Sequence, residues 1–427
     1  MSGTEQRILK LETECAEKQL QYLYGSGAEM LKAQKFRYAA ILRRHSELFG
    51  EKEDVQLVSA PGRAEIGGNH TDHNHGRVLA AAVNLDILCA ASPREDLTVR
   101  FFSEGHAPLE MSLDDLSVRP EENGTTQALI RGVAADMARN GYRIGGFDAA
   151  VTSTVAPGSG LSSSAALEVM LTGVLDRLYN RFDMPYQLRA QIGKSAENDY
   201  FGKPSGLLDQ MASAAGGLVT VDFQDTDHPE VEALSYDFAE KGYAVVVVAT
   251  GGSHADLTDQ YAAIPKEMKD VAGFFGKPVL RDLTAGQLTD ALGALRSETS
   301  DRAIMRAFHF IRENDRVPKQ VAALREDRIK DFLQLIIESG RSSYMYLQNV
   351  FADPRDQSLS LALCLAEELL NGKGAWRIHG GGFAGTTLNF VPLEMVDSFV
   401  SLMNRAFGAN ACLVINIRPV GAAVVEL

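Results

Sequence analysis

The stretch APGSGLSSSAALEV, residues 156–169, is a glycine and serine loop that runs directly into an apolar helical pattern. Gly158 and Gly160 allow a tight turn in which the backbone can approach a ligand closely. Three serines stand behind them, where the helix begins: Ser162, Ser163 and Ser164. Free N–H groups and the positive end of the helix dipole attract anions at such a position. The run is longer than helix capping requires, so the loop is interpreted as a cradle for a phosphate chain.

The segments on either side of this loop mix strands with helices. Strands are expected at 55–61, 76–92, 97–103, 146–155, 216–223 and 243–250, and a strand, a glycine loop and a strand at 375–391. Helices are expected within 5–48, 126–140, 162–179 and 186–202, and throughout 257–370. The pattern predicts an α+β fold with a helical extension over residues 1–48. Two domains follow, over 49–225 and 226–427.

A second notable stretch, APGRAEIGGNHTDHNHGRVL, covers residues 60–79 and crowds three histidines around Asp72. Neutral imidazoles and a carboxylate could hold zinc. The stretch lies between two expected strands, however, and not on a helix that would pair histidines four positions apart. A polar loop that faces a substrate is therefore favoured over a zinc site.

Four motifs, in family order, resemble those of the GHMP small-molecule kinases, and the match spans about residues 50–427. PGSGLSSSAA resembles their phosphate loop, and PGRAEIGGNHTDHNHG resembles the galactokinase signature. HGGGFAGTT, residues 379–387, resembles the third GHMP motif, and RAFHFIRENDRV, residues 306–317, resembles a helix common in galactokinases. The resemblance implies an N-terminal domain like the second domain of ribosomal protein S5, a ferredoxin-like C-terminal domain, and an active site in the cleft between them.

The resemblance also implies an activity, the phosphorylation of the C1 hydroxyl of D-galactose by ATP. The nucleotide would contact the loop residues Gly158, Ser159, Gly160, Leu161, Ser162, Ser163 and Ser164, with Gly381 and Gly382 approaching from the third motif. The sugar would contact Asn69, His70, Asp72, Gly206 and Tyr261. Mg²⁺, which prefers oxygen ligands, would be held by Ser164 and Glu197.

Asp209, in the apolar stretch GLLDQMAS, matches the catalytic aspartate of the family, with Arg63 beside it. A neighbouring guanidinium would keep this carboxylate ionised and stabilise charge that develops on the attacking oxygen. Whether Asp209 accepts the hydroxyl proton or orients the hydroxyl stays open.

The sugar loop departs from the family pattern, because Asn69 replaces a glutamate that lies against C6 of the sugar. Loss of this carboxylate removes a repulsion toward a 6-carboxylate, so a 1-kinase of galacturonate is a second hypothesis. His73, Glu65, Gly67 and His379 are further departures. A catalytically silent sugar-sensing regulator is a third hypothesis, against which the complete serine run of the phosphate loop argues.

The composition limits the class of partner. A net charge of −14 over 427 residues argues against nucleic acid and anionic membranes. The four scattered cysteines are typical of reduced thiols, and the first 20 residues lack the apolar core of a signal peptide. A cytoplasmic protein whose partners are a sugar and ATP is expected, with no prediction of its oligomeric state.

Overall fold

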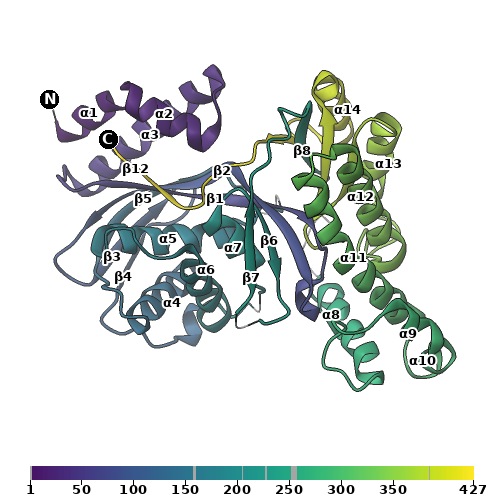
Figure 1. The fold of residues 1–427 in the computed structure, drawn as a ribbon. Coiled ribbons are helices and arrows are strands. Elements are labelled where there is room, and N and C mark those ends of the chain that lie inside the picture. The colour runs from purple at the N-terminus through teal and green to yellow at the C-terminus, as the bar shows by residue number, and fades with distance from the viewer. Residues whose placement is uncertain (1, 157–159, 204, 227, 252–256, 384) are drawn as a thin grey trace.

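The computed structural model describes residues 2–156, 160–203, 205–226, 228–251, 257–383 and 385–427. Two β-sheets with separate helical layers make up the molecule (Figure 1). The larger sheet is built on two long antiparallel strands, β1 (Gln56–Gly67) and β2 (Arg77–Pro93). The predicted mixture of strands and helices in two parts is therefore confirmed.

The described part of the larger sheet has the strand order β12-β1-β2-β5-β3-β4, and β6 and β7 extend it from the other half of β2. Strands β3 and β5 are parallel, and the other pairs are antiparallel. The bounds of these strands are Thr98–Ser103 for β3, Leu109–Ser112 for β4, Phe147–Ser153 for β5, Leu218–Asp222 for β6, Glu230–Leu234 for β7 and Ala423–Val425 for β12.

Strand β1 differs from its prediction, which ended it at Pro61. The strand continues to Gly67, and its register with β2 shifts between Pro61 and Arg63 and again between Glu65 and Gly67. Proline has no N–H to donate to a ladder, and bulges are the places in a sheet that tolerate it. The extra length carries Arg63 and Glu65 into the site described below.

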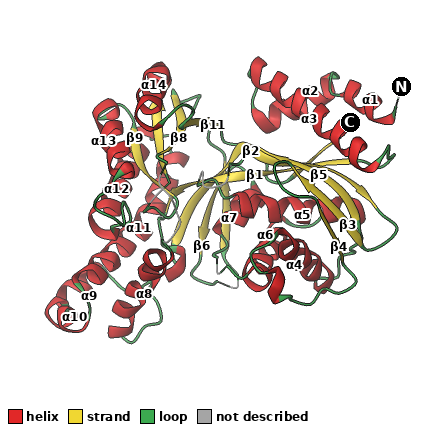
Figure 2. Ribbon diagram, turned by 180° about the vertical axis from the view of Figure 1, so that it is seen from behind, coloured by secondary structure: helices red, strands yellow, loops and turns green. Residues whose placement is uncertain are grey.

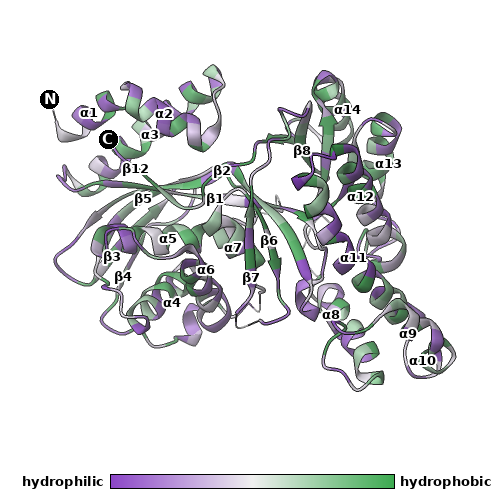
Figure 3. Ribbon diagram, viewed as in Figure 1, coloured by the Kyte–Doolittle hydropathy of each residue, from purple (hydrophilic) through white to green (hydrophobic). Residues whose placement is uncertain are grey.

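Helices cover both faces of the larger sheet (Figures 1 and 2). On one face lie α4 (Thr126–Arg139), α5 (Ser163–Tyr179), α6 (Tyr186–Ser195), a π-helical segment (Ala196–Phe201) and α7 (Leu208–Ala215). The N-terminal helices α1 (Gly3–Lys10), α2 (Glu14–Tyr24) and α3 (Ala28–Phe49) cover the other face. These three helices carry both hydrophilic and hydrophobic residues (Figure 3), as helices with one buried side do.

The smaller sheet is antiparallel, in the order β11-β8-β10-β9. Its strands are β8 (Tyr243–Ala249), β9 (Ala375–His379), β10 (Thr386–Pro392) and β11 (Cys412–Ile415). The helices of this half are α8 (Thr258–Phe274), α9 (Ala285–Asp290), α10 (Leu292–Glu298), α11 (Asp301–Arg325), α12 (Ile329–Ser342), α13 (Ser358–Leu370) and α14 (Val396–Phe407). Among the described residues, none of these or the earlier helices has the length and apolar character that crossing a bilayer needs.

One hydrophobic core joins the two halves. Ile66 and Leu79 of the larger sheet pack in the same cluster as Val245, Phe332 and Phe390 of the second half. Strands β7 and β12, from residues beyond 226, pair with the larger sheet. The division of the chain at residues 225 and 226 stays a prediction.

Candidate active site

The predicted phosphate loop joins β5 to α5 and lies against the smaller sheet. Gly158 and Ser159 lie outside the described residues. Gly160 has φ 72°, and a Cβ added to it would lie 2.6 Å from Thr386 Oγ1 and 2.9 Å from His379 Nδ1. Only glycine combines this φ with so close an approach. The backbone at Gly160 therefore passes close to His379 at the end of β9 and to Thr386 at the start of β10.

The first turn of α5 is open to an anion. Ser162 has φ 58°, and the turn has no side-chain capping bond among the described residues. The Ser162 hydroxyl donates instead to Asp209. Ser163 and Ser164 are partly exposed. The serines therefore leave the N–H groups of the first turn available, as the prediction of a phosphate cradle requires.

Arg63 and Asp209, 146 positions apart in the sequence, form a two-pronged ion pair beneath this loop. Arg63 Nε lies 2.7 Å from Asp209 Oδ1, and Arg63 Nη2 lies 2.8 Å from Oδ2. The remaining Arg63 nitrogen donates to the Gly160 carbonyl, and the Arg63 backbone N–H donates to the Leu161 carbonyl at 2.9 Å. The predicted catalytic pair is thus in contact with the predicted phosphate loop.

The Asp209 carboxyl is ionised. Burial works to raise its pKa, but the Arg63 charge and the hydrogen bonds from Arg63 and Ser162 outweigh burial and hold the pKa below its usual value. About a third of the side chain stays exposed (32%). Asp209 is therefore a charged acceptor that a substrate hydroxyl can reach.

Glu197 lies beside Ser164, as the magnesium prediction requires. Ser164 Oγ donates to Glu197 Oε1 at 3.0 Å, and Lys203 Nζ lies 2.6 Å from the same oxygen. Gln210 Nε2 donates to Glu197 Oε2 at 3.0 Å and to Glu168 Oε2 at 2.9 Å. Burial, followed by the charge of Glu197, raises the pKa of Glu168 well above its usual value. The hydroxyl and carboxylate oxygens of Ser164 and Glu197 suit a hard cation such as Mg²⁺.

The histidine stretch forms a one-turn 3₁₀ helix over Asp72–Asn74 between β1 and β2. His70 has φ 58°, and its ring Nε2 lies 2.9 Å from the Gly381 carbonyl. Burial, followed by the neighbouring His73, lowers the pKa of His70 to about 4. Because a carbonyl only accepts, the neutral ring donates from Nε2.

Among the described residues, no group of three or more His, Cys, Asp or Glu side chains converges on a metal position. The geometry gives the reason. His70 is turned to a backbone carbonyl, and the 3.6 Å between His73 Nε2 and Asp72 Oδ1 joins a single pair. The zinc interpretation of this loop gains no support from the structure.

The carboxylate of Asp72 occupies space that is open because residue 206, in another segment, is a glycine. A Cβ added to Gly206 would lie 2.6 Å from Asp72 Oδ2. Two of the five residues predicted to contact the sugar are therefore neighbours, Asp72 from the histidine stretch and Gly206 from the segment just before α7. Both are partly exposed, so both are accessible to a ligand.

The third loop, which follows β9, faces the histidine stretch. The Gly381 carbonyl accepts from His70 and from Asn349 Nδ2 at 3.0 Å, and the Gly382 carbonyl accepts from the Tyr261 hydroxyl at 2.7 Å. A Cβ on Gly381 would lie 2.7 Å from Tyr261 Cε1. The carbonyls of Gly381 and Gly382 accept hydrogen bonds from protein side chains. The contact of both glycines with a nucleotide therefore stays a prediction.

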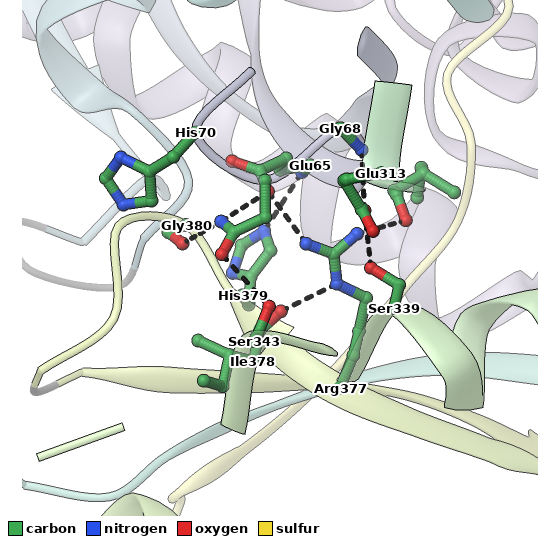
Figure 4. Close-up of polar contacts among 12 residues, drawn as sticks. Glu65, Gly68, His70, Glu313, Ser339, Ser343, Arg377, Ile378, His379 and Gly380 are labelled. Carbon is green, nitrogen blue, oxygen red and sulfur yellow. Dashed lines mark hydrogen bonds and ion pairs between the residues drawn. The ribbon is translucent and has the colours of Figure 1, made fainter. Parts of the chain in front are cut away.

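The side chain of Asn69 is turned into the protein, toward Glu65, Gly380 and Ser343, which are labelled in Figure 4. The residue is completely buried, and its Nδ2 donates to Glu65 Oε1 at 2.9 Å and to the Gly380 carbonyl at 2.8 Å. Its Oδ1 accepts from Asn349 at 2.9 Å and from Ser343 at 3.2 Å. These bonds occupy both N–H groups and both lone pairs. In the structure, Asn69 therefore supports the loop, and its direct contact with the sugar stays a prediction.

Arg377 and Glu313, which the sequence analysis did not identify, support the same loop from the side of the second half of the chain (Figure 4). Arg377 pairs with Glu65 Oε1 at 2.8 Å and donates to the Ile66 carbonyl at 2.6 Å. From α11, Glu313 accepts from the Gly68 N–H at 3.1 Å, and His309 Nε2 lies 2.9 Å from the Asn69 carbonyl. The motif at 306–317 could have suggested α11, but its inward side chains follow only from packing.

His379, another departure from the family pattern, has a defined tautomer. The Glu65 N–H donates to its Nε2 at 3.2 Å, so Nδ1 carries the proton and donates to Thr386 Oγ1 at 3.0 Å. Burial, followed by the charges of Arg63 and Arg377, lowers the pKa of His379 well below its usual value. A neutral imidazole therefore ties β1 to the smaller sheet next to Gly160.

A cavity of about 810 Å³ lies beside the start of α5. Side chains of β2, β3, β5 and α4 give it apolar residues, its lining also includes polar residues such as Glu104, His106 and Gln127, and Ser163 and Ser164 reach its edge. The lining includes Ile87, Phe101, Leu129, Val151, Val155, Ser163 and Ser164. Its size and lining suit a flat aromatic group whose charged tail ends at the helix N-terminus.

Comparison with known proteins gives two family profiles that match this chain and a relative that is similar over most of its length. The profile of the galactokinase galactose-binding signature matches residues 43–93, and that of the N-terminal domain of GHMP kinases matches residues 128–217. A galactokinase of Streptomyces coelicolor is 32% identical over 368 residues, which are 86% of this chain and 92% of that relative.

Two solved structures show the same fold. The crystal structure of Lactococcus lactis galactokinase complexed with galactose has a TM-score of 0.79 and 24% identity, covering 91% of this chain and 99% of that one. Methanococcus jannaschii mevalonate kinase has a TM-score of 0.62 and 13% identity, over 86% of this chain and 99% of that one.

Proposed function

The chain belongs to the galactokinase family of GHMP kinases, and we propose that it transfers the γ-phosphoryl group of ATP to the C1 hydroxyl of D-galactose. The observation that carries this proposal is the Arg63–Asp209 pair, which is bound to the carbonyl of Gly160 in the phosphate loop. The pair joins the nucleotide side of the site to the acceptor side, where phosphoryl transfer must occur.

The reaction asks mainly for positioning and for charge neutralisation. The C1 oxygen of the sugar forms a bond to the γ-phosphorus, and the bond from that phosphorus to the bridging oxygen of ADP breaks. Asp209, which is ionised, accepts a hydrogen bond from the C1 hydroxyl and lies where the proton can be received. Arg63 holds the carboxylate by two nitrogens, and its charge offsets the charge that develops on the oxygen.

The sugar lies, in this proposal, between the histidine stretch and the segment before α7. Asp72 accepts from its hydroxyl groups, and Gly206 provides the space beside Asp72. His70 is held by the Gly381 carbonyl through Nε2, so its Nδ1 is an acceptor in the neutral ring. Tyr261, tied to Gly382, closes the same side of the site.

The Gly206→Ala variant is expected to weaken sugar binding, because its methyl group occupies the place of Asp72 Oδ2. The KM for galactose should rise by roughly tenfold or more, as when a buried hydrogen bond to a charged group is lost. The dissociation constant for ATP should stay unchanged. Initial-rate kinetics and calorimetry of each ligand separate the two effects, and an unchanged KM would remove Gly206 from the sugar site.

The ATP side of the proposal uses the first turn of α5 for the phosphates and the 810 Å³ cavity for the base. Ser164 and Glu197 would hold Mg²⁺. The chemistry that Mg²⁺ supplies when bound is neutralisation of the phosphate oxygens. Gln210 Nε2 donates to Glu197 Oε2 and so supports the orientation of this carboxylate toward Ser164.

The Glu197→Gln variant is expected to need a higher Mg²⁺ concentration for half-maximal rate, by roughly tenfold, since a neutral amide is a poorer ligand for a hard cation. Its circular dichroism and its melting temperature should stay close to those of the wild type. A Mg²⁺ titration at saturating ATP and galactose measures the shift. An unchanged requirement would exclude Glu197 from the metal site.

The choice of sugar is tested by ADP release with galactose, galacturonate, N-acetylgalactosamine, glucose and buffer alone. Galactose is expected to give the highest kcat/KM. The galacturonate hypothesis rested on Asn69 facing C6 of the sugar, whereas all polar groups of Asn69 bond within the protein. A kcat/KM for galacturonate that exceeds that for galactose by tenfold would overturn the assignment, and galactose binding without turnover would indicate the silent regulator.

A further inference from the structure

Lys203 follows a turn at Gly202 that brings it beside Glu197, the carboxylate predicted to hold Mg²⁺. The π-helical segment ends at Gly202, which has φ 82°, and a Cβ on Gly202 would lie 2.1 Å from Asn123 Nδ2. The Lys203 backbone N–H donates to the Glu197 carbonyl at 3.0 Å. Because glycine favours this φ, the turn fixes the backbone of Lys203 beside Glu197, while its side chain keeps its freedom to move.

The ammonium group of Lys203 lies 2.6 Å from Glu197 Oε1, the oxygen that also accepts from Ser164 at 3.0 Å. A cation therefore stands at the place where Ser164 and Glu197 converge. The Lys203 side chain is 56% exposed, whereas Glu197 is buried. The lysine can therefore move its charge by a few ångströms without losing packing.

The negative charges of the site suggest that Lys203 has a role besides its ion pair with Glu197. The carboxylates of Glu197 and Asp209 lie here beside Glu168, whose raised pKa favours its neutral form, and Arg63 binds Asp209 through both Nε and Nη2. The charge of Lys203 also helps to keep the pKa of Asp209 low, so its field reaches from the metal carboxylate to the reacting centre. A triphosphate that enters brings further negative charge into the space between them.

We propose that Lys203 binds the terminal phosphate of the nucleotide: its ammonium neutralises Glu197 while the site is free, and moves to the γ-phosphate when the metal–nucleotide arrives. This inference rests on the proposed function. It assigns a phosphate-binding cation outside the four motifs of the sequence. A lysine is suited to this role, since its compact charge and three rotating donors follow a group that is being transferred.

The test compares nucleotide binding in the absence of sugar for Lys203→Met, Lys203→Arg and the wild type. Calorimetry with Mg²⁺ and a non-hydrolysable ATP analogue should give a dissociation constant roughly tenfold higher for Lys203→Met, the loss expected for one charged hydrogen bond. The constant for ADP should change by less than about twofold, because ADP lacks the group that Lys203 binds. Lys203→Arg, which retains the charge, should restore most of the binding.

Lys266→Met is the matched control, since Lys266 pairs with Asp270 on α8 at 3.0 Å in a similar single ion pair. It should bind both nucleotides as the wild type does. Equal losses for ADP and the ATP analogue in Lys203→Met would show that Lys203 acts only on Glu197 and would overturn the proposal, as would no loss at all. If Lys203→Met does not fold, Lys203→Gln is measured in the same way. Binding without sugar is independent of which sugar is phosphorylated, so failure of the proposed substrate leaves this test intact.

Discussion

The Asp209→Asn variant is expected to phosphorylate galactose at least about 100-fold more slowly than the wild type, while its affinity for galactose and for ATP stays within a fewfold. Asparagine has nearly the same shape as aspartate, and its single oxygen can still accept from Ser162 and from Arg63 Nη2, although its NH₂ group cannot accept from Arg63 Nε. It has no negative charge with which to attract or receive the hydroxyl proton. The loss should therefore appear in kcat and not in KM.

The measurement is steady-state kinetics of purified protein, with calorimetry of galactose as the check that the site is intact. Asp290→Asn, at the exposed end of α9, is the control and should retain wild-type kcat. Near-normal turnover of Asp209→Asn would show that Asp209 is no part of the chemistry. A solvent isotope effect on kcat that disappears in the variant would favour proton transfer over orientation.

The Asp86→Asn variant is expected to lose about 3–5 kcal/mol of unfolding free energy, the usual cost of leaving buried charges without their partner. Asp86 is completely buried on β2 and binds Arg37 of α3 at 2.5 Å and Arg418 at 3.2 Å. The Tyr24 hydroxyl of α2 donates to it at 2.5 Å. One carboxylate thus joins the N-terminal helices, the larger sheet and the C-terminal segment.

Acid should reproduce part of this loss in the wild type. Burial works to raise the pKa of Asp86, but Arg37 and Arg418 outweigh burial and hold the pKa below its usual value. A carboxyl whose pKa is lower in the folded state stabilises the protein above its unfolded pKa, about 4, and that stabilisation is lost as pH falls toward the folded pKa. Asp86→Asn should therefore show a flatter dependence of stability on acidic pH.

Denaturant unfolding at neutral and acidic pH measures both effects. Asp353→Asn, which breaks an exposed ion pair with Arg355 at 2.7 Å, is the control and should change stability by less than about 1 kcal/mol. A midpoint for Asp86→Asn equal to that of the wild type would contradict the role given to Asp86. Because the chain has two sheets and several cores, two probes of unfolding should be compared before a single free energy is assigned.

The sequence alone predicted the elements that depend on local patterns. Strand β5, helix α5 and the N-terminal helices are present where the pattern indicated them, because periodicity acts within a few positions. Residues 157–159 of the predicted loop lie outside the described residues. The strands at 109–112, 230–234, 412–415 and 423–425 were missed. They are short, and their pairing partners rather than their composition define them.

The sequence by itself also suggested which residues belong to the site, namely Arg63, Asp209, Ser164 and Glu197. The structure places each of these pairs in contact. The sequence did not reveal toward which neighbours each side chain points. Asn69 stands in the sugar-loop motif, yet its side chain turns inward to Asn349, 280 positions away.

Only the tertiary structure decided which side chains face a ligand and which support the loop. His379 reaches Glu65 across 314 positions, and Arg377 reaches the same residue across 312. Lys203 lies outside the four motifs, and the turn at Gly202 brings it beside Glu197. The physical reason is that a buried polar group must find its partners wherever the fold brings them, and contacts across hundreds of residues leave no periodic trace in the sequence.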